Sequence, residues 1–144
     1  MMKRLLSVLI VLSSLTILSN SEAGTIKEEY ELHERCGKHA EEWFKHEYGK
    51  GSYKTDDGTA IAGYTNHYNS KLNICFILLS INYFAHQKAE KEKYTHTEDL
   101  FDINEQKGYG SFYKNGDAVI CNVGDKVCPS IFQWNALIKP YMEE

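Results

Sequence analysis

The sequence predicts an α+β domain in which a central antiparallel sheet of about four to five strands is flanked by an N-terminal and a C-terminal helix. Three observations predict this class: apolar residues at helical spacing over 26–48, strand-like apolar patterns over 60–123, and a second helical pattern after Ser130. The chain also contains four cysteines, which we expect to staple the domain with disulfides: Cys36, Cys75, Cys121 and Cys128.

Residues 1–23 have the three-part pattern of a cleaved secretory signal. Two positive charges precede an apolar run from Leu5 to Leu18, and small residues stand at Ser21 and Ala23, the positions that signal peptidase reads. The run is shorter than the roughly 20 apolar residues of a spanning helix, which argues against a membrane anchor. We therefore predict a single domain over 24–144, periplasmic or secreted, with no stable membrane insertion after cleavage.

The charge balance bears on possible partners. The chain has 16 basic and 20 acidic residues and a net charge of −4, without a basic stripe. A mildly acidic surface of this kind is unsuited to nucleic acid and to anionic membranes. We expect no nucleic-acid partner, and a partner that is an unknown envelope protein or a small ligand.

Residues 26–48 are predicted to form an amphipathic helix, with charged residues on the face opposite its apolar stripe. Gly49 follows and can adopt the left-handed conformation that ends many helices. Glycines and aspartates between Gly51 and Gly58 then predict a loop. The apolar stripe consists of Leu32, Cys36, Ala40, Trp43 and Phe44.

Five strands are expected between residues 60 and 123. The second is apolar on both alternating faces, which is typical of a central strand covered on both sides. The charged stretch 87–93 predicts a solvated loop, and Asn115-Gly116 predicts a hairpin turn, because both residues tolerate positive φ. The expected strands are 60–69, 72–84, 97–104, 108–113 and 118–123.

The C-terminal segment is predicted to be helical. Ser130 can cap the helix, and Gln133 stands at the spacing of a capping box. Pro140 predicts that the helix kinks or ends just before it, because proline lacks the backbone N–H. The apolar face would contain Ile131, Trp134, Leu137, Ile138 and Tyr141.

An even number of cysteines in an exported chain predicts disulfides, although four cysteines allow three connectivities. Gly124-Asp125 can reverse the chain and bring Cys121 to Cys128, while a Cys36–Cys75 bond would join the first helix to the central strand. We predict these two pairs. The short paired spacings of zinc sites and the C-x-x-C of redox pairs are absent, which argues against metal-binding or catalytic thiols.

Several segments resemble a family of small exported bacterial proteins of uncharacterised function. The segments are Cys36–Phe44, the stretch Tyr64–Phe76, Cys121-x6-Cys128 followed by Ser130, and the ending Leu137–Met142. The resemblance implies a bacterial, exported product with the same cysteine framework. It implies no activity and no functional residue.

The densest polar and aromatic cluster is Asn66, His67, Tyr68 and Asn69, where alternate residues would point to opposite faces of a strand. One interpretation is a recognition surface, or a general base at His67. The other is a hairpin whose asparagines bond the turn backbone and whose tyrosine packs. The second is favoured, because no motif identifies an acid or nucleophile partner.

A second cluster, His39, Glu42 and His46, would share one face of the first helix. Such a set could hold a metal. Its spacing is not that of H-E-x-x-H, however, and a helix rich in Glu and His produces such triplets by chance. We therefore assign no metal site.

The remaining motifs suggest no catalytic residue and no cofactor. The chain lacks a G-x-S-x-G motif, a phosphate-binding glycine loop and a calcium-loop pattern. The carboxylate pairs Asp56-Asp57 and Glu98-Asp99 are expected to be solvated, because neighbouring residues on a strand or turn seldom converge on one substrate.

These observations favour a non-enzymatic binding or interaction module of the bacterial cell envelope, with an inhibitor as its sharper form. Ten tyrosines support a binding role, because tyrosine suits surfaces that are half buried. The alternative is a small periplasmic hydrolase or metal-dependent enzyme using His67 or the His39/Glu42/His46 face.

Overall fold

The computed structural model describes residues 21–86 and 94–143, with side chains from Ile26 onward. The chain divides into two compact units, Met1–Leu32 and His33–Glu144. The predicted signal peptide, 1–23, lies almost wholly outside the described residues, and so does the predicted loop 87–93. None of the described helices combines the length and hydropathy needed to cross a membrane.

Helix α1 covers Ser21–Tyr48 and so begins in the first unit and ends in the second. In the first unit its side chains include the exposed pair Lys27–Glu31. In the second, Cys36 and Ala40 are buried on the predicted stripe. The helix ends as predicted at Gly49, which has a φ of 59° and donates its N–H to the Lys45 carbonyl.

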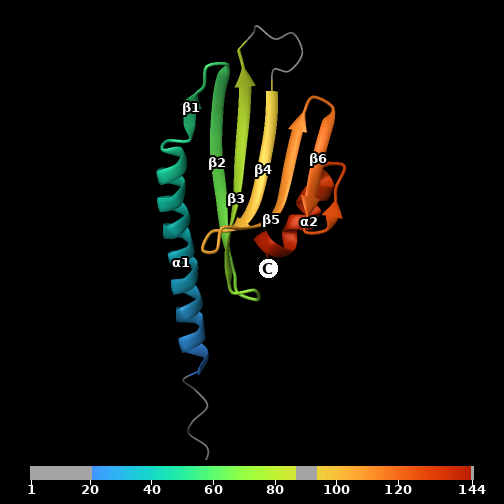
Figure 1. Ribbon diagram of the computed structural model, residues 1–144. Coiled ribbons are helices and arrows are strands. Elements are labelled where there is room, and N and C mark those ends of the chain that lie inside the picture. The colour runs from blue at the N-terminus through green and yellow to red at the C-terminus, as the bar shows by residue number, and fades with distance from the viewer. Residues whose placement is uncertain (1–20, 87–93, 144) are drawn as a thin grey trace, which may run out of the picture. The chain divides into compact units, whose positions relative to one another are not determined.

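The second unit contains one seven-stranded antiparallel sheet in which every strand pairs with its neighbours in the sequence (Figure 1). The long strands are β2 to β6, and the two edge strands are very short. The strands are β1 (Ser52–Lys54), β2 (Gly58–Asn69), β3 (Ile74–Ala85), β4 (Tyr94–Asp102), β5 (Lys107–Asn115), β6 (Ala118–Val123) and β7 (Lys126–Val127).

The α+β class and the terminal helices are confirmed, but the expected number of strands was wrong: the sheet has seven, not four to five. The two additional strands, β1 and β7, contain three and two residues. Segments this short carry no periodic signal, and both lie within stretches whose glycines predict turns. Only pairing with β2 and β6 makes them strands.

The two faces of the sheet are covered differently. Helix α2 (Ile131–Met142) packs on one face through a closed hydrophobic core. The second-unit part of α1 contacts the other face, where Trp43 meets Phe101 and Phe44 meets Tyr64. The core beneath α2 consists of Phe76, Leu100, Phe112, Cys121, Val123, Cys128, Trp134 and Ile138.

Both disulfides have the pairing that the sequence predicts. Cys36–Cys75 joins α1 to β3, with 5.5 Å between the Cα atoms. Cys121–Cys128 closes the chain reversal around Gly124, whose φ is 58°. Cys121 and Cys128 also belong to the core beneath α2, so the two bonds stabilise opposite faces of the sheet.

Helix α2 begins as predicted, because the Ser130 hydroxyl accepts a hydrogen bond from the Gln133 N–H. It does not end before Pro140 but continues to Met142. Beyond Pro140 the last turn still closes, since the Glu143 N–H bonds to the Lys139 carbonyl at 2.8 Å. The Pro140 carbonyl accepts from Asn69, so tertiary contact holds this end of the helix.

A candidate ligand-binding groove

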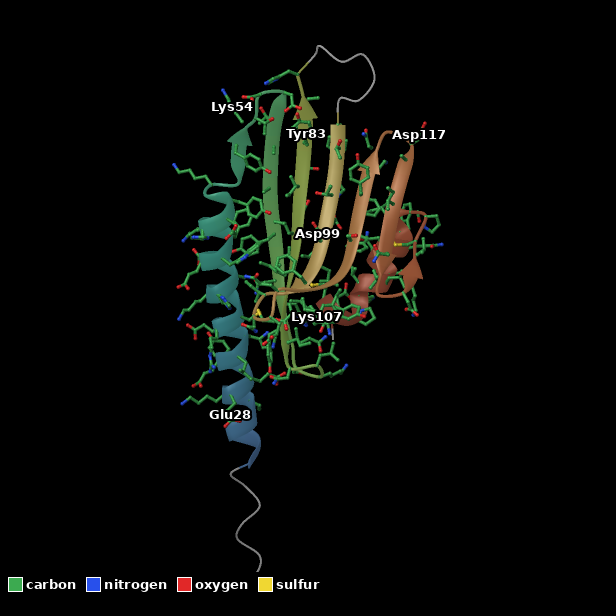
Figure 2. All side chains as sticks on the ribbon, in the orientation of Figure 1. Glu28, Lys54, Tyr83, Asp99, Lys107 and Asp117 are labelled. Carbon is green, nitrogen blue, oxygen red and sulfur yellow. A yellow bond between two sulfur atoms is a disulfide. The ribbon has the colours of Figure 1, made fainter. Side chains whose placement is uncertain are left out.

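A row of cross-strand neighbours crosses the middle of the sheet on the face that α1 contacts. Leu79 on β3 is opposite Asp99 on β4, Asp99 is opposite Ser111 on β5, and Ser111 is opposite Asn122 on β6. Side chains paired across antiparallel strands share a face. Figure 2 shows Asp99 midway along β4. The row therefore begins apolar and becomes polar away from α1.

Aromatic side chains form one wall beside this row. Trp43 on α1 packs edge-on against Phe101, with 5.2 Å between ring centroids, and lies 5.8 Å from Tyr48. Because Phe101 is two residues from Asp99 on β4, both side chains point to the same face. The wall therefore stands next to the carboxylate.

Two glycines of β5 shape the floor. Gly108 is opposite Phe101, and a Cβ atom placed on it would meet no atom within 4 Å. Gly110 is opposite Leu100, and its Cβ would lie 3.0 Å from Trp134 Cζ3 on the other face. Gly108 thus leaves open space on the α1 side, whereas Gly110 admits the close approach of Trp134.

Together these residues enclose a groove of about 600 Å³. Trp43 and Tyr48 of α1 form one side, Leu79 and Phe101 continue it, and the backbone of β5 forms the floor. Asp99, Ser111 and Asn122 supply the polar side, with the Ser111 hydroxyl donating to Asn122 Oδ1 at 3.1 Å.

Asp99 is the electrostatic centre of the groove. Asp99 is an exposed residue, so water still reaches its carboxylate, but its surroundings remove part of this hydration and raise the pKa of the carboxyl above its ordinary value. The pKa of Tyr48 is also raised, first by desolvation and then by nearby negative charges that include Asp99. Within the described part of the chain, no cation is paired with the Asp99 carboxylate.

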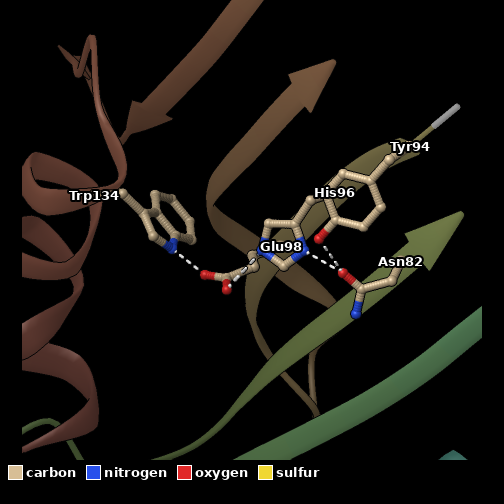
Figure 3. Close-up of polar contacts among 5 residues, drawn as sticks. All are labelled: Asn82, Tyr94, His96, Glu98 and Trp134. Carbon is tan, nitrogen blue, oxygen red and sulfur yellow. Dashed lines mark hydrogen bonds and ion pairs between the residues drawn. The ribbon is translucent and has the colours of Figure 1, made fainter. Parts of the chain in front are cut away.

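The opposite face contains a polar network beneath α2 (Figure 3). His96 Nε2 lies 3.0 Å from Glu98 Oε1, and His96 Nδ1 lies 2.8 Å from Asn82 Oδ1. The Tyr94 hydroxyl donates to the same Asn82 oxygen, and the Trp134 indole N–H donates to Glu98 Oε2. The network thus connects three elements: β3, β4 and α2.

This network connects α2 to the sheet through the bond between Trp134 and Glu98. It also shows that the prediction for Glu98 was wrong. Glu98 was expected to be solvated, but its side chain is only 16% exposed. Trp134 is fully buried, and its indole N–H needs an acceptor, which Glu98 supplies. Both ring nitrogens of His96 likewise lie within hydrogen-bond distance of side-chain oxygens, so the polar groups of the network contact one another.

The predicted cluster Asn66, His67, Tyr68 and Asn69 is divided between the two faces. Asn66 contacts the Cys36 sulfur at 3.8 Å, and the Tyr68 hydroxyl donates to Asn73 Oδ1 at 2.6 Å. Asn69 is 1% exposed and donates to the Pro140 carbonyl at 3.0 Å, while its own Oδ1 accepts from the Leu72 N–H. His67 lies 6.0 Å from His33, ring to ring. None of the four lines the groove.

The predicted helix cluster His39, Glu42 and His46 is also divided in its contacts. His39 Nδ1 lies 3.1 Å from Asn104 Oδ1, whereas His46 Nδ1 lies 2.8 Å from Glu47 Oε1. Across the described residues, no three His, Cys, Asp or Glu side chains are placed to hold a metal ion. None of the cluster lines the groove either.

Sequence reasoning therefore missed the groove. Trp43 was assigned only to the apolar stripe of the helix. Asp99 was expected to be solvated and is exposed as expected, but the groove beside it was not foreseen. Part of the groove could have been predicted, because Phe101 and Asp99 are two residues apart on one strand and therefore share a face. The other wall of the groove comes from α1. Trp43 is 56 residues before Asp99 in the sequence, so no local pattern predicts that the two lie near each other.

Comparison with known proteins gives no relative: no family model, no curated protein and no solved structure matches the chain.

Proposed function

We propose that this protein is an exported binding module of the bacterial cell envelope, periplasmic or secreted, whose recognition site is the groove between α1 and strands β3 to β6. The observation that carries the proposal is a groove of about 600 Å³ that combines the aromatic rings of Trp43 and Phe101 with the exposed Asp99 carboxylate, which has no cationic partner in the described chain. The two disulfides support an oxidising compartment.

The dimensions and lining of the groove suit a small ligand. Ligand sites in proteins are typically concave, about 300–1,000 Å³ in volume, and mostly apolar with a few placed polar groups. This groove combines Trp43, Phe101 and Leu79 with a polar side of Asp99, Ser111 and Asn122. Two smaller openings lie on the α2 side. One, of about 270 Å³, is lined in part by His96 and Glu98, whose side chains bond to each other, and the other, of about 440 Å³, lies between α2 and β7.

The electrostatics of Asp99 support a binding role beside the geometry of the groove. The carboxylate is exposed, but its neighbours remove part of its hydration, which raises its pKa. Perturbed titratable groups concentrate at functional sites. A ligand that covers the groove would also cover this carboxylate and replace its remaining water.

The site can be tested by fragment screening with NMR detection on the oxidised protein. Aromatic and aliphatic fragments should shift the amide signals of Gly108, Ser111 and Asn122 more than the amide signals of residues outside the groove. Gly108→Val should remove these shifts, because its side chain fills the open floor, where a Cβ atom meets nothing within 4 Å.

Gly63→Val is the matched control. Gly63 is also a strand glycine with no atom within 4 Å of an added Cβ, but it lies on β2 outside the groove. It should leave the fragment shifts unchanged. Shifts that persist in Gly108→Val, or that disappear equally in Gly63→Val, would contradict the assignment of the site.

A further inference from the structure

We infer that the ligand of the groove is a small organic cation, an ammonium group carried on an aromatic body, with the ammonium bound at Asp99. This inference rests on the proposed function and specifies its ligand class. It follows from the charge, the aromatic wall and the hydrogen-bond state of the groove.

Charge is the first argument. The residues lining the groove include one carboxylate, Asp99, and no lysine, arginine or histidine among those described. The chain as a whole has a net charge of −4. An anionic ligand would place a second negative charge against Asp99, and a neutral ligand would supply at most an uncharged hydrogen bond. A cation supplies both a hydrogen bond and the complementary charge.

The aromatic wall is the second argument. The Trp43 ring centroid lies 5.2 Å from that of Phe101 and 5.8 Å from that of Tyr48, so the three rings form one aromatic cluster that lines the groove. The faces of such rings attract cations, and tryptophan attracts them most strongly. The same rings give apolar contact to the body of the ligand. A cation with an apolar body therefore uses both properties.

Hydrogen bonding is the third argument. Ser111 already donates to Asn122, so these two polar side chains partly satisfy each other. Asp99 has no such bond to another described side chain, and an ionised carboxylate can only accept. An ammonium group can only donate. An ammonium group therefore offers Asp99 the charged donor that no described side chain lining the groove carries.

A matched series of probes tests this inference by calorimetric titration at neutral pH. Phenethylamine, 2-phenylethanol and 3-phenylpropionate have the same ring on a short chain and differ in charge: positive, neutral and negative. We expect phenethylamine to bind at least tenfold more tightly than 2-phenylethanol, and 3-phenylpropionate to bind most weakly. Added salt should weaken the binding of phenethylamine only.

Asp99→Asn isolates the role of the charge, because the amide preserves the shape of the side chain. It should reduce phenethylamine binding to the level of 2-phenylethanol, whose affinity should not change. Gly108→Val should weaken both probes, and Gly63→Val neither. Thermal unfolding of each variant checks that it folds.

The two proposals fail in different ways. If phenethylamine has no advantage, or keeps it in Asp99→Asn, while Gly108→Val still weakens 2-phenylethanol, the ligand class is wrong and the groove remains the site. If no probe binds in a manner that depends on Gly108, both proposals are wrong.

A lysine side chain on a protein carries the same ammonium group, and a fourth probe separates this source. This probe is Nα-acetyl-lysine methylamide, whose side-chain amine is free. It has the positive charge but no aromatic body. It should bind more weakly than phenethylamine. Tighter binding would overturn the assignment to a small ligand.

Discussion

Glu98 and Asp99 are adjacent on β4 and have opposite environments. Glu98 points toward α2, where it accepts from the Trp134 indole and contacts His96 at 3.0 Å. Asp99 points toward α1, where desolvation raises its pKa and no described cation compensates it. The difference shows that the carboxylate on one face of the sheet is bonded within the protein, while the carboxylate on the other face is left to solvent and to a ligand.

The glycines of β5 repeat this contrast. A Cβ atom on Gly110 would meet Asn122 O at 2.8 Å and Trp134 Cζ3 at 3.0 Å, whereas one on Gly108 would meet nothing within 4 Å. Gly110 is required by close packing on the α2 face. Gly108 is required by nothing in the described structure, and its absent side chain keeps the groove open.

Truncating a tryptophan on each face should produce the largest difference. Trp134→Ala removes a fully buried side chain and leaves Glu98 without its donor, so we expect a loss of about 3–5 kcal/mol in the free energy of unfolding. Trp43→Ala removes a half-buried side chain and should lower the free energy of unfolding by less than about 2 kcal/mol. Urea denaturation of the oxidised protein measures both. Equal losses would mean that the two faces are packed alike.

Adding one methyl group to each glycine should have an effect of intermediate size. Gly110→Ala must displace backbone and core atoms, and we expect it to destabilise the fold by about 1–3 kcal/mol. Gly108→Ala should be neutral or stabilise by up to about 1 kcal/mol, because alanine restricts the unfolded chain. The same denaturation experiment compares them. A destabilising Gly108→Ala would show that the floor of the groove is already filled.

The smallest effect should come from the charge of Asp99. A carboxyl whose pKa is raised on folding binds its proton more tightly in the folded state, so its ionisation destabilises the fold at neutral pH. Asp99→Asn should therefore raise the melting temperature at pH 7. The gain should shrink as the pH falls through the raised pKa and vanish below the ordinary value of 3.8, where both states are protonated.

Glu98→Ala is the opposing variant for this measurement. It leaves the Trp134 indole and a His96 nitrogen without their acceptor, and we expect it to lower the melting temperature at pH 7. A gain of stability from both substitutions would remove the distinction between the two carboxylates.

Local patterns predicted most of the fold. The end of α1 at Gly49, the Ser130 cap, the five long strands and both disulfide pairs follow from periodicity, capping residues and turn residues. Local patterns failed at β1 and β7, whose identity as strands comes from their partners, and at Pro140, where Asn69 holds the helix end. Each failure involves a contact made across the fold.

The candidate site was less predictable for the same reason. The alternation of a strand is enough to place Glu98 and Asp99 on opposite faces. Which face α2 covers, and where Trp43 of α1 lies beside Phe101, depends on the packing of the two helices. Solvation of a side chain depends on the distant segment that covers it, so the difference between a carboxylate bonded within the protein and one left to solvent appears only when the helices are in place.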